Sequence, residues 1–497
     1  MELSSTVPDS SAVVISNAKK STRTRPTSTS SRFASFVLWL LNSISSWRTW
    51  TSRPHTAPTS SELYLRPAPG TLLPGEEPYV VPLQRALYGV RDSGKCWNGE
   101  ITTSLTEFGL MQSHFDPCVF FKIAEEKPTM IFEIYTDDLI SGHHASTEAE
   151  YQRIKSAIKK RYKSRDVDLR LNNFIGHRIT QDLAAGTVTL DQDEYIQSVL
   201  ADFPPNQSVP VPCKDDAVSK TLSRDAPATD YPYRRVLGRT RYACNTRADI
   251  AFAQGFWERF STAPGPEHVS GVQFMMKYLA GHPSAHLVYR KNRDVKFLRI
   301  NAYSDSSWAD CPITACSTEG SLLRLGDGVI AFSSRKQRIT KKPDPSDQID
   351  LDPLDPTNEP AQSAHEAEYV SASNTCKEIV WLEELLTELQ CLDPESKPSL
   401  AMDNRPAIQT AFARGLLKGS RHIRARFHKV RAMAQAGDLI LEWLPSDQNL
   451  SDIFTKPLSK LPFRRLRDLI LFMNDRDRPL QVASLALRLS RQLEQPA

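Results

Sequence analysis

The stretch that decides the fold of this chain is AYSDSSWAD (residues 302–310), in which Asp305 directly follows apolar, strand-forming residues. Three more acids stand in comparable places downstream: Glu368 in SAHEAEYV, Asp403 in AMDNRPAI and Asp452 in NLSDIFTK. Each lies where an apolar strand ends or a helix begins. Two divalent ions can align an attacking water and a leaving oxygen only if oxygen ligands hold them close together. The four acids therefore predict a two-metal phosphodiesterase site, in which all four are catalytic residues and metal ligands.

The elements expected around these acids would carry them to one sheet. Strands are predicted at 297–303, on both sides of the Gly326-Asp327-Gly328 turn, at 398–402 and at 439–444. Ser363 and Glu366 form a capping-box pattern at the start of a long helix. Because Glu366 is then used in capping, Glu368 is the better metal ligand. Asp452 is expected to open the last helix.

Four motifs of this region, SDSSWAD, HEAEYVSAS, MDNRPAI and NLSDIFTK, resemble the ribonuclease H domain of copia-type LTR retrotransposon polyproteins. The resemblance continues upstream and covers most of the chain. It implies an α/β protein, with an α+β palm and thumb fragment of a reverse transcriptase followed by a ribonuclease H-like mixed sheet with flanking helices. It also implies two Mg2+ ions as cofactors and an RNA–DNA hybrid as substrate, recognised by its minor groove and 2′-hydroxyls.

The upstream segments ELYLRPAPG, VPLQRALYGVRDSGKCW, FDPCVFF and IFEIYTDDLI follow the order found in copia-type reverse transcriptases. Met130 to Tyr135 is an apolar strand that leads into Asp137 and Asp138. An isolated pair of aspartates would be an ordinary polar turn. With these neighbours, the resemblance implies that Asp137 and Asp138 are remnants of a polymerase metal site.

The third carboxylate of such a polymerase is missing. The resemblance places it at Thr49, and no Asp or Glu occurs from Ser10 to Ser61. Loss of one metal ligand removes preorganised charge stabilisation, an effect of several kcal/mol on phosphoryl transfer. The chain is therefore not expected to polymerise DNA by itself, and its palm is expected to lack a partner strand.

A run of basic residues lies close to the third acid of the phosphodiesterase motif. No acid occurs between Asn404 and Gly437. The candidate nucleic-acid-binding residues of this run are Arg414, Lys418, Arg421, His422, Arg424, Arg426, His428 and Lys429. The run predicts a phosphate-facing helix and loop, and a solvated basic face is the alternative. His422 and His428 are expected to contact phosphate or pack, rather than to transfer protons.

Composition and the resemblance to copia-type polyproteins together imply five parts, at 1–61, 62–204, 205–295, 296–475 and 476–497. They are a disordered Ser/Thr/Arg-rich tail, a truncated palm and thumb, a linker and connection region, the ribonuclease H-like domain and a C-terminal tail helix. A basic, Ser-rich presequence is the alternative for the first part. Residues 341–360, rich in Pro and Asp, predict a solvated loop, which would either repel a hybrid or be a mispredicted fragment.

The cysteines and the apolar run near the N-terminus indicate the compartment in which the protein is expected. Eight scattered cysteines without a CxxC pair indicate neither a zinc site nor a disulfide framework, so a reducing compartment, the cytoplasm or nucleus, is expected. The apolar run 33–41 is too short to span a bilayer, which favours a protein without a membrane partner.

Three functions stay open from the residues. In the first, the chain is an RNA–DNA hybrid ribonuclease with an inactive polymerase part, able to pair with a complete Pol subunit. In the second, it is a nucleic-acid-binding relic of a degenerate element without catalysis. In the third, its basic N-terminal tail serves an interaction with a partner.

Overall fold

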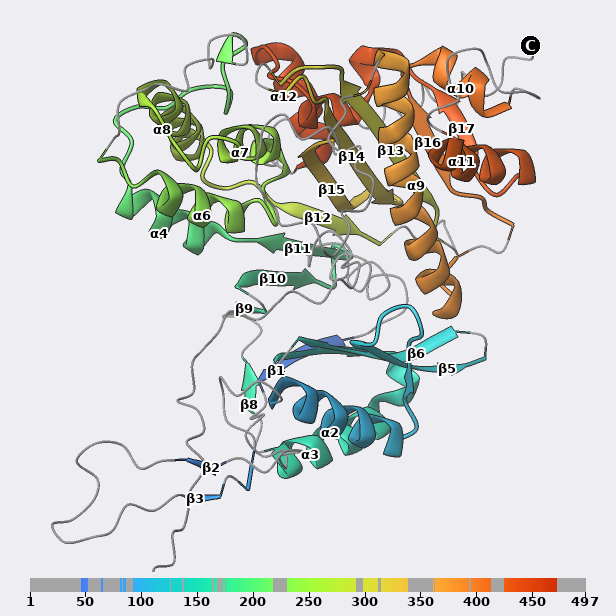
Figure 1. The fold of residues 1–497 in the computed structure, drawn as a ribbon. Coiled ribbons are helices and arrows are strands. Elements are labelled where there is room, and N and C mark those ends of the chain that lie inside the picture. Colours follow the sequence, from blue (N-terminus) through green and yellow to red (C-terminus); the bar gives the residue numbers. More distant parts are fainter. Residues whose placement is uncertain are drawn as a thin grey trace, which may run out of the picture.

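The computed structural model describes residues 46–51, 64–65, 81–82, 84–85, 93–125, 127–135, 138–162, 165–167, 173–174, 176–217, 230–291, 298–311, 314–337, 361, 363–392, 395–412 and 424–471. These residues form three main sheets and a short ribbon of β2 (Tyr64–Leu65) with β3 (Val81–Pro82). Figure 1 shows the sheets one above another, with helices against their faces. Mixed helices and sheets confirm the predicted fold class.

The first sheet, called the palm sheet or palm here because it lies largely in the part predicted to be the palm, has the strand order β4-β5-β6-β7-β1-β8. Its strands are β1 (Ser46–Thr51), β4 (Met111–Gln112), β5 (Val119–Ala124), β6 (Lys127–Tyr135), β7 (Asp138–His143) and β8 (Arg165–Val167). Helices α2 (Ser93–Glu107) and α3 (Glu148–Tyr162) lie on one side of it (Figure 1). Buried Trp97, Phe132 and Tyr151 form part of their shared core, because β6 is apolar on both faces. The predicted strand leading into the aspartates is confirmed.

Strand β1 corrects the expectation for the N-terminal part. It lies between β7 and β8, with Thr51 opposite Asp138 and Thr49 opposite Ile140. The prediction that all of 1–61 is disordered is therefore wrong for residues 46–51. The prediction that the palm lacks its partner strand is also wrong, because β1 pairs with β7. The sequence SWRTWT is rich in aromatic and β-branched residues, which favour strands, and pairing satisfies the backbone groups that an open edge of β7 would expose. A composition averaged over the whole Ser-rich tail concealed this short segment.

The second sheet has the order β12-β11-β10-β9 and joins the predicted thumb to the connection region. Its strands are β9 (Asn173–Phe174), β10 (His177–Asp182), β11 (Thr187–Asp191) and β12 (Leu287–Arg290). The helices beside it are α4 (Asp193–Asp202), α6 (Tyr233–Ala243), α7 (Ala251–Glu258) and α8 (Pro266–Gly281). Gly176, with a φ of 68°, turns the chain between β9 and β10.

The third sheet has the order β15-β14-β13-β16-β17. Its strands are β13 (Ile300–Ser307), β14 (Thr318–Leu325), β15 (Gly328–Lys336), β16 (Ser399–Met402) and β17 (Ile440–Trp443). The first three pair antiparallel, whereas β16 lies parallel to β13 and β17 parallel to β16. This is the mixed sheet that was predicted. Its helices are α9 (Ala364–Glu388), α10 (Arg405–Phe412), α11 (Arg424–Ala436) and α12 (Lys460–Ile470), with a short 3-10 helix, η7 (Leu450–Phe454), before α12.

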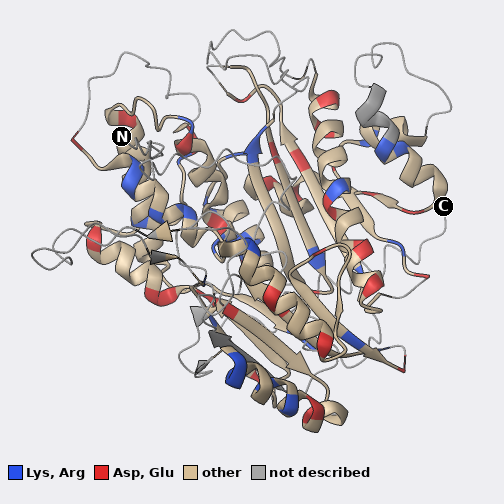
Figure 2. Ribbon diagram, turned by 60° about the horizontal axis from the view of Figure 1, so that its bottom comes forward, with Lys and Arg blue, Asp and Glu red and all other residues tan. Residues whose placement is uncertain are grey.

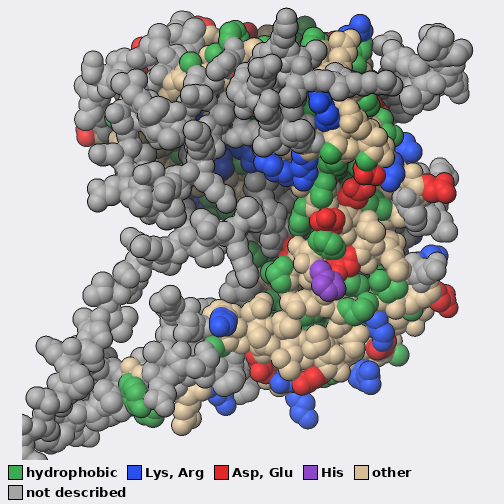
Figure 3. Space-filling model, turned by 45° about the vertical axis from the view of Figure 1, so that its right-hand side comes forward, with side chains coloured by type: hydrophobic (Ala, Val, Ile, Leu, Met, Phe, Trp, Pro, Cys, Tyr) green, Lys and Arg blue, Asp and Glu red, His purple; other side chains and the backbone are tan. Residues whose placement is uncertain are grey.

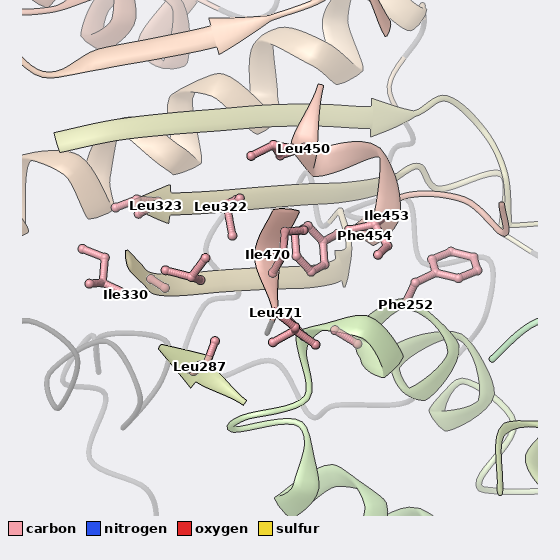
Figure 4. Packing of buried hydrophobic residues seen from close by; sticks show 14 of the residues in the cluster. Phe252, Leu287, Leu322, Leu323, Ile330, Leu450, Ile453, Phe454, Ile470 and Leu471 are labelled. Carbon is pink, nitrogen blue, oxygen red and sulfur yellow. The ribbon is translucent and has the colours of Figure 1, made fainter. Parts of the chain in front are cut away.

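The second and third sheets share one apolar core. Figure 4 shows Leu450, Ile453 and Phe454 of η7 packed beside Leu322 of β14, with Leu471 between them and the region of α7 and β12. Each of the three η7 side chains is at most 4% exposed. Burial of such a side chain contributes roughly 1.5–3 kcal/mol, so the position of η7 is fixed firmly although it makes little regular structure.

The palm contacts the third sheet's long helix directly. Glu388, the last residue of α9, accepts hydrogen bonds from the backbone N–H of His114 (3.0 Å) and from the Ser113 hydroxyl. The Trp381 indole donates to the carbonyl of Phe115 at 3.2 Å. These contacts join the loop between β4 and β5 to the C-terminal half of α9. No helix among the described residues has both the length and the apolar content needed to cross a membrane.

Candidate metal centre

Asp305 and Asp403 are brought together by the parallel pairing of β13 and β16. The register joins Asn301 to Ser399 and Tyr303 to Ala401. Continued by two residues, it sets Asp403 beside Asp305. Asp305 lies inside β13, whereas a position just after the strand was expected. The strand runs further because Ser306 and Ser307 still pair with β14.

Asp452 reaches the same place on η7. Asn449, which is fully buried, donates to the carbonyl of Ser304 at 3.0 Å, and its side chain accepts from the backbone N–H of Ser451. The Thr455 hydroxyl donates to Oδ2 of Asp305. These bonds tie both ends of η7 to β13. The expectation that Asp452 opens the last helix is wrong, because α12 begins only at Lys460 and Asp452 sits in the separate 3-10 turn.

Glu368 is delivered by the first turns of α9. The Ser363 hydroxyl accepts from the backbone N–H of Glu366 at 3.2 Å, as predicted for the N-cap. Glu368, two residues further on, accepts from the backbone N–H of Ser306 through Oε1 at 3.2 Å. Ser371 on the next turn donates to the carbonyl of Asp305 at 2.9 Å. The helix is therefore fastened to β13 on either side of Asp305.

The carboxylates form a close group of like charges. One oxygen each of Asp305, Asp403 and Asp452 lie within 4.8 Å of one another. Burial, followed by the charges of Asp305 and Asp403, raises the pKa of Glu368 well above its usual range. Burial and Asp305 raise the pKa of Asp452 to about 7, and burial also raises the pKa of Asp403. Bringing four such groups together is unfavourable unless cations or protons join them.

The residues fit a hard divalent cation. Oε2 of Glu368 and Oδ1 of Asp452 are buried and have no hydrogen-bond partner within the described part of the chain. Buried polar atoms are nearly always paired, so these two oxygens indicate that a cation binds to them. Mg2+ takes oxygen ligands of this kind, and no zinc-like set of Cys or His lies among them. Figure 2 shows that Asp and Glu positions occur on strands as well as on helices.

A second group of possible ligands, Asp191, Asp193 and His286, is already balanced by a cation. Arg178 lies 3.0 Å from Asp191 and 3.5 Å from Asp193. An arginine cannot give up its proton in a protein, so this group forms an ion-pair network.

The rim of the centre contains residues that the sequence reasoning missed. Ser446 donates to Oδ2 of Asp403 at 2.6 Å, and the Trp443 indole donates to its carbonyl at 3.0 Å. The Arg405 guanidinium stacks over the Trp443 ring, 3.8 Å from its centroid. Lys456 forms an ion pair of 2.9 Å with Asp452. Lys456 stands in the quoted motif NLSDIFTK, so it could have been singled out as a cation next to an acid, whereas Arg405 is the first cation of the acid-free basic run after Asn404.

The other predicted site residues are only partly described. Of the polymerase pair, Asp138 opens β7 and is partly buried, while Asp137 lies outside the described residues. Arg424, Arg426, His428 and Lys429 lie on α11, where only the side chain of Lys429, half-buried, is described. Outside the described residues lie Arg414, Lys418, Arg421 and His422. The phosphate-facing role of this run stays a prediction.

Comparisons with known proteins agree with the motifs. Residues 55–213 match the family model described as reverse transcriptase (RNA-dependent DNA polymerase). A retrovirus-related Pol polyprotein from transposon RE1 of Arabidopsis thaliana is 28% identical over 408 residues, which are 82% of this chain and 26% of that protein. The chain spans 26% to 29% of the length of the Pol polyproteins from RE1, RE2 and tobacco transposon TNT 1-94.

Solved structures match the chain only at low sequence identity and low TM-score. A foamy viral protease-reverse transcriptase in complex with double-stranded DNA is 12% identical, with a TM-score of 0.44, over 82% of this chain and 60% of that one. An RNase H1 isolated from compost is 14% identical, with a TM-score of 0.23, over 32% of this chain and 92% of that one. The chain is thus similar to the Pol polyproteins of copia-type retrotransposons over 82% of its length, and its residues 55–213 match the reverse transcriptase family model.

Proposed function

We propose that the carboxylate centre is a ribonuclease H site that hydrolyses the RNA strand of RNA–DNA hybrids. The observation that carries this is the convergence of Asp305, Glu368, Asp403 and Asp452 from four separate elements. Two Mg2+ ions held by these residues would supply an activated water and stabilisation of the leaving 3′ oxygen. Sites of this class need carboxylates close together, and the oxygens of the three aspartates meet that need.

The chain's own residues hold the ligands in place. Asn449 and Thr455 fix η7 against β13, so that Asp452 faces Asp305. Ser446 orients Asp403 from the rim. A ligand set held within a fraction of an ångström binds metal and substrate without reorganisation, which is the main source of catalytic power in such sites.

The proposed substrate, a nucleic acid, is supported by the basic and aromatic side chains beside the centre and by the similarity to transposon Pol polyproteins. The stacked Arg405 and Trp443 next to Asp403 offer a guanidinium for a phosphate and an aromatic face for a sugar or base. On the face shown in Figure 3, described Lys and Arg side chains gather in a band beside acidic and hydrophobic ones. The basic run of α11 would extend this contact. None of the eight cysteines is in a disulfide bond, which supports a reducing compartment such as the cytoplasm or nucleus.

The palm is proposed to be inactive as a polymerase. Strand β1 is in place, but its sequence SWRTWT offers no carboxylate opposite Asp138. A complete Pol subunit would be needed for DNA synthesis, and the junction at Glu388 would keep this palm beside the nuclease. Primer extension by the chain alone is expected to be absent.

Cleavage of a labelled RNA–DNA hybrid tests the nuclease. The purified chain with Mg2+ should cut the RNA strand, and EDTA should stop it. Asp403→Asn should abolish cutting and leave hybrid binding intact, because the preceding strand β16 is held by backbone pairing with β13 and β17. Asp438→Asn is the matched control, since Asp438 pairs only with Lys397 at the surface among the described residues. Binding without Mg2+-dependent cleavage would instead support the second candidate, a non-catalytic relic, which the missing carboxylate of β1 favours.

A further inference from the structure

Lys456 is a cation inside the carboxylate centre that the proposed chemistry does not use. It follows η7 by two residues, and its Nζ lies 2.9 Å from Oδ2 of Asp452. Its side chain is half-buried. Among the described side chains, no other lysine or arginine forms an ion pair with any of the four acids.

The two carboxylate oxygens of Asp452 have different surroundings. Oδ2 is held by Lys456, whereas Oδ1 is buried without a hydrogen bond in the described structure. The same carboxylate belongs to the group whose oxygens, with those of Asp305 and Asp403, could surround an ion. One oxygen is therefore available to a metal, and the other already has a cation.

An ammonium at this distance occupies a place that a second ion would need. Lysine carries one positive charge at neutral pH, and this charge is concentrated in a compact ammonium group. A divalent ion bound to Oδ2 would meet the ammonium at close range, where like charges in a partly buried site repel strongly. A second ion can enter only if Lys456 turns away toward solvent.

We propose that Lys456 is a resident cation of the centre, which takes one of two cation places and is displaced when a second divalent ion binds. The proposal rests on the proposed nuclease function for the identity of the ligands. In the wild-type centre, one position would then bind a divalent ion tightly, and the position occupied by Lys456 would bind a second ion weakly. Lys456 is thus a positioning residue that sets metal occupancy.

Mn2+ binding to the full chain without nucleic acid tests this, with free Mn2+ measured by electron paramagnetic resonance. The wild type should bind one ion tightly. Lys456→Met should bind two, with the second at least tenfold tighter than in the wild type, because nothing then competes for Oδ2. Lys456→Gln should behave as Lys456→Met, and Lys456→Arg as the wild type. Lys460→Met, an exposed lysine one turn further on, is the control and should not change binding.

The outcomes separate the two proposals. Hybrid cleavage together with identical Mn2+ binding by wild type, Lys456→Met and Lys456→Gln would overturn the role of Lys456 alone. Weaker binding in both neutral variants would also overturn it, since the lysine would then support the ion. Absence of Mn2+ binding in every protein would overturn the nuclease as well. Far-ultraviolet circular dichroism shows that the compared variants are folded.

Discussion

Removing one charge from the centre should stabilise the metal-free protein, and Asp452→Asn is the sharpest test. Burial and the neighbouring Asp305 raise the pKa of Asp452 to about 7. An ordinary aspartate has a pKa near 3.9, and each pH unit of difference corresponds to about 1.4 kcal/mol. The charged carboxylate therefore destabilises the folded chain by at most about 4 kcal/mol at pH 8. Relaxation and water entry reduce this, so about 2 kcal/mol is expected.

The sign of the pH dependence follows from proton binding. Between about pH 4 and pH 7 the folded chain holds a proton on Asp452 that the unfolded chain has released. The contribution of this group to stability is therefore complete at low pH and lost as the pH rises through about 7. Asparagine is neutral throughout. Asp452→Asn should thus exceed the wild type in stability at pH 8 and differ little at pH 4.

Thermal unfolding in EDTA at pH 4 and pH 8 measures the effect. A gain of about 2 kcal/mol corresponds to a rise in Tm of about 5 °C for a domain of this size. Asp438→Asn, at the surface, should change Tm little at either pH. An Asp452→Asn protein that is equally or less stable than the wild type at pH 8 would refute the close packing of like charges, and with it the geometry of the centre.

Three further predictions follow from the same contacts. Mg2+ should raise the Tm of the wild type more at pH 8 than at pH 6, because protons compete for carboxylates with raised pKa values; an equal rise at both would contradict this. Asn449→Ala should lower stability by about 2 kcal/mol in chemical unfolding, because it leaves the Ser304 carbonyl unpaired, and it should reduce cleavage more than hybrid binding. Arg405→Ala should raise KM for the hybrid and lower the salt slope of binding by about one, while Mn2+ binding stays unchanged.

The sequence predicts the elements whose signals are local. The hairpin around Gly326 is confirmed because a left-handed glycine marks its turn, with φ of 60°. The start of α9 is confirmed because Ser363 caps it. The short strands before Asp403 and after the basic run are confirmed because each is an apolar run between polar segments. Turn and cap chemistry act within a few residues, so one sequence suffices to read them.

The features that the sequence misses depend on distant partners. Strand β1 is strand-like only over six residues, and its place is fixed by β7, which lies far along the chain. The turn η7 has no helical periodicity, and it is held by Asn449 and by apolar contacts with β14. That Asp305 falls within β13 follows from pairing with β14 beyond the apolar residues. Such pairings are tertiary, and local propensity does not report them.

The palm sheet and the carboxylate centre differ in whether acids stand where the fold brings strands together. Strand β1 pairs with β7 through backbone groups, so the palm sheet persists whether or not a carboxylate stands opposite Asp138. At the third sheet the backbone pairing of β13 and β16 is equally independent of Asp305 and Asp403, yet there the acids are present, with Asp305 buried and Asp403 partly buried, and their charges raise the pKa of Glu368. Acids that the fold does not need and that destabilise it without a cation are explained by binding one. The carboxylate centre therefore has a physical reason for its four acids, whereas the palm sheet has a strand, β1, without a carboxylate.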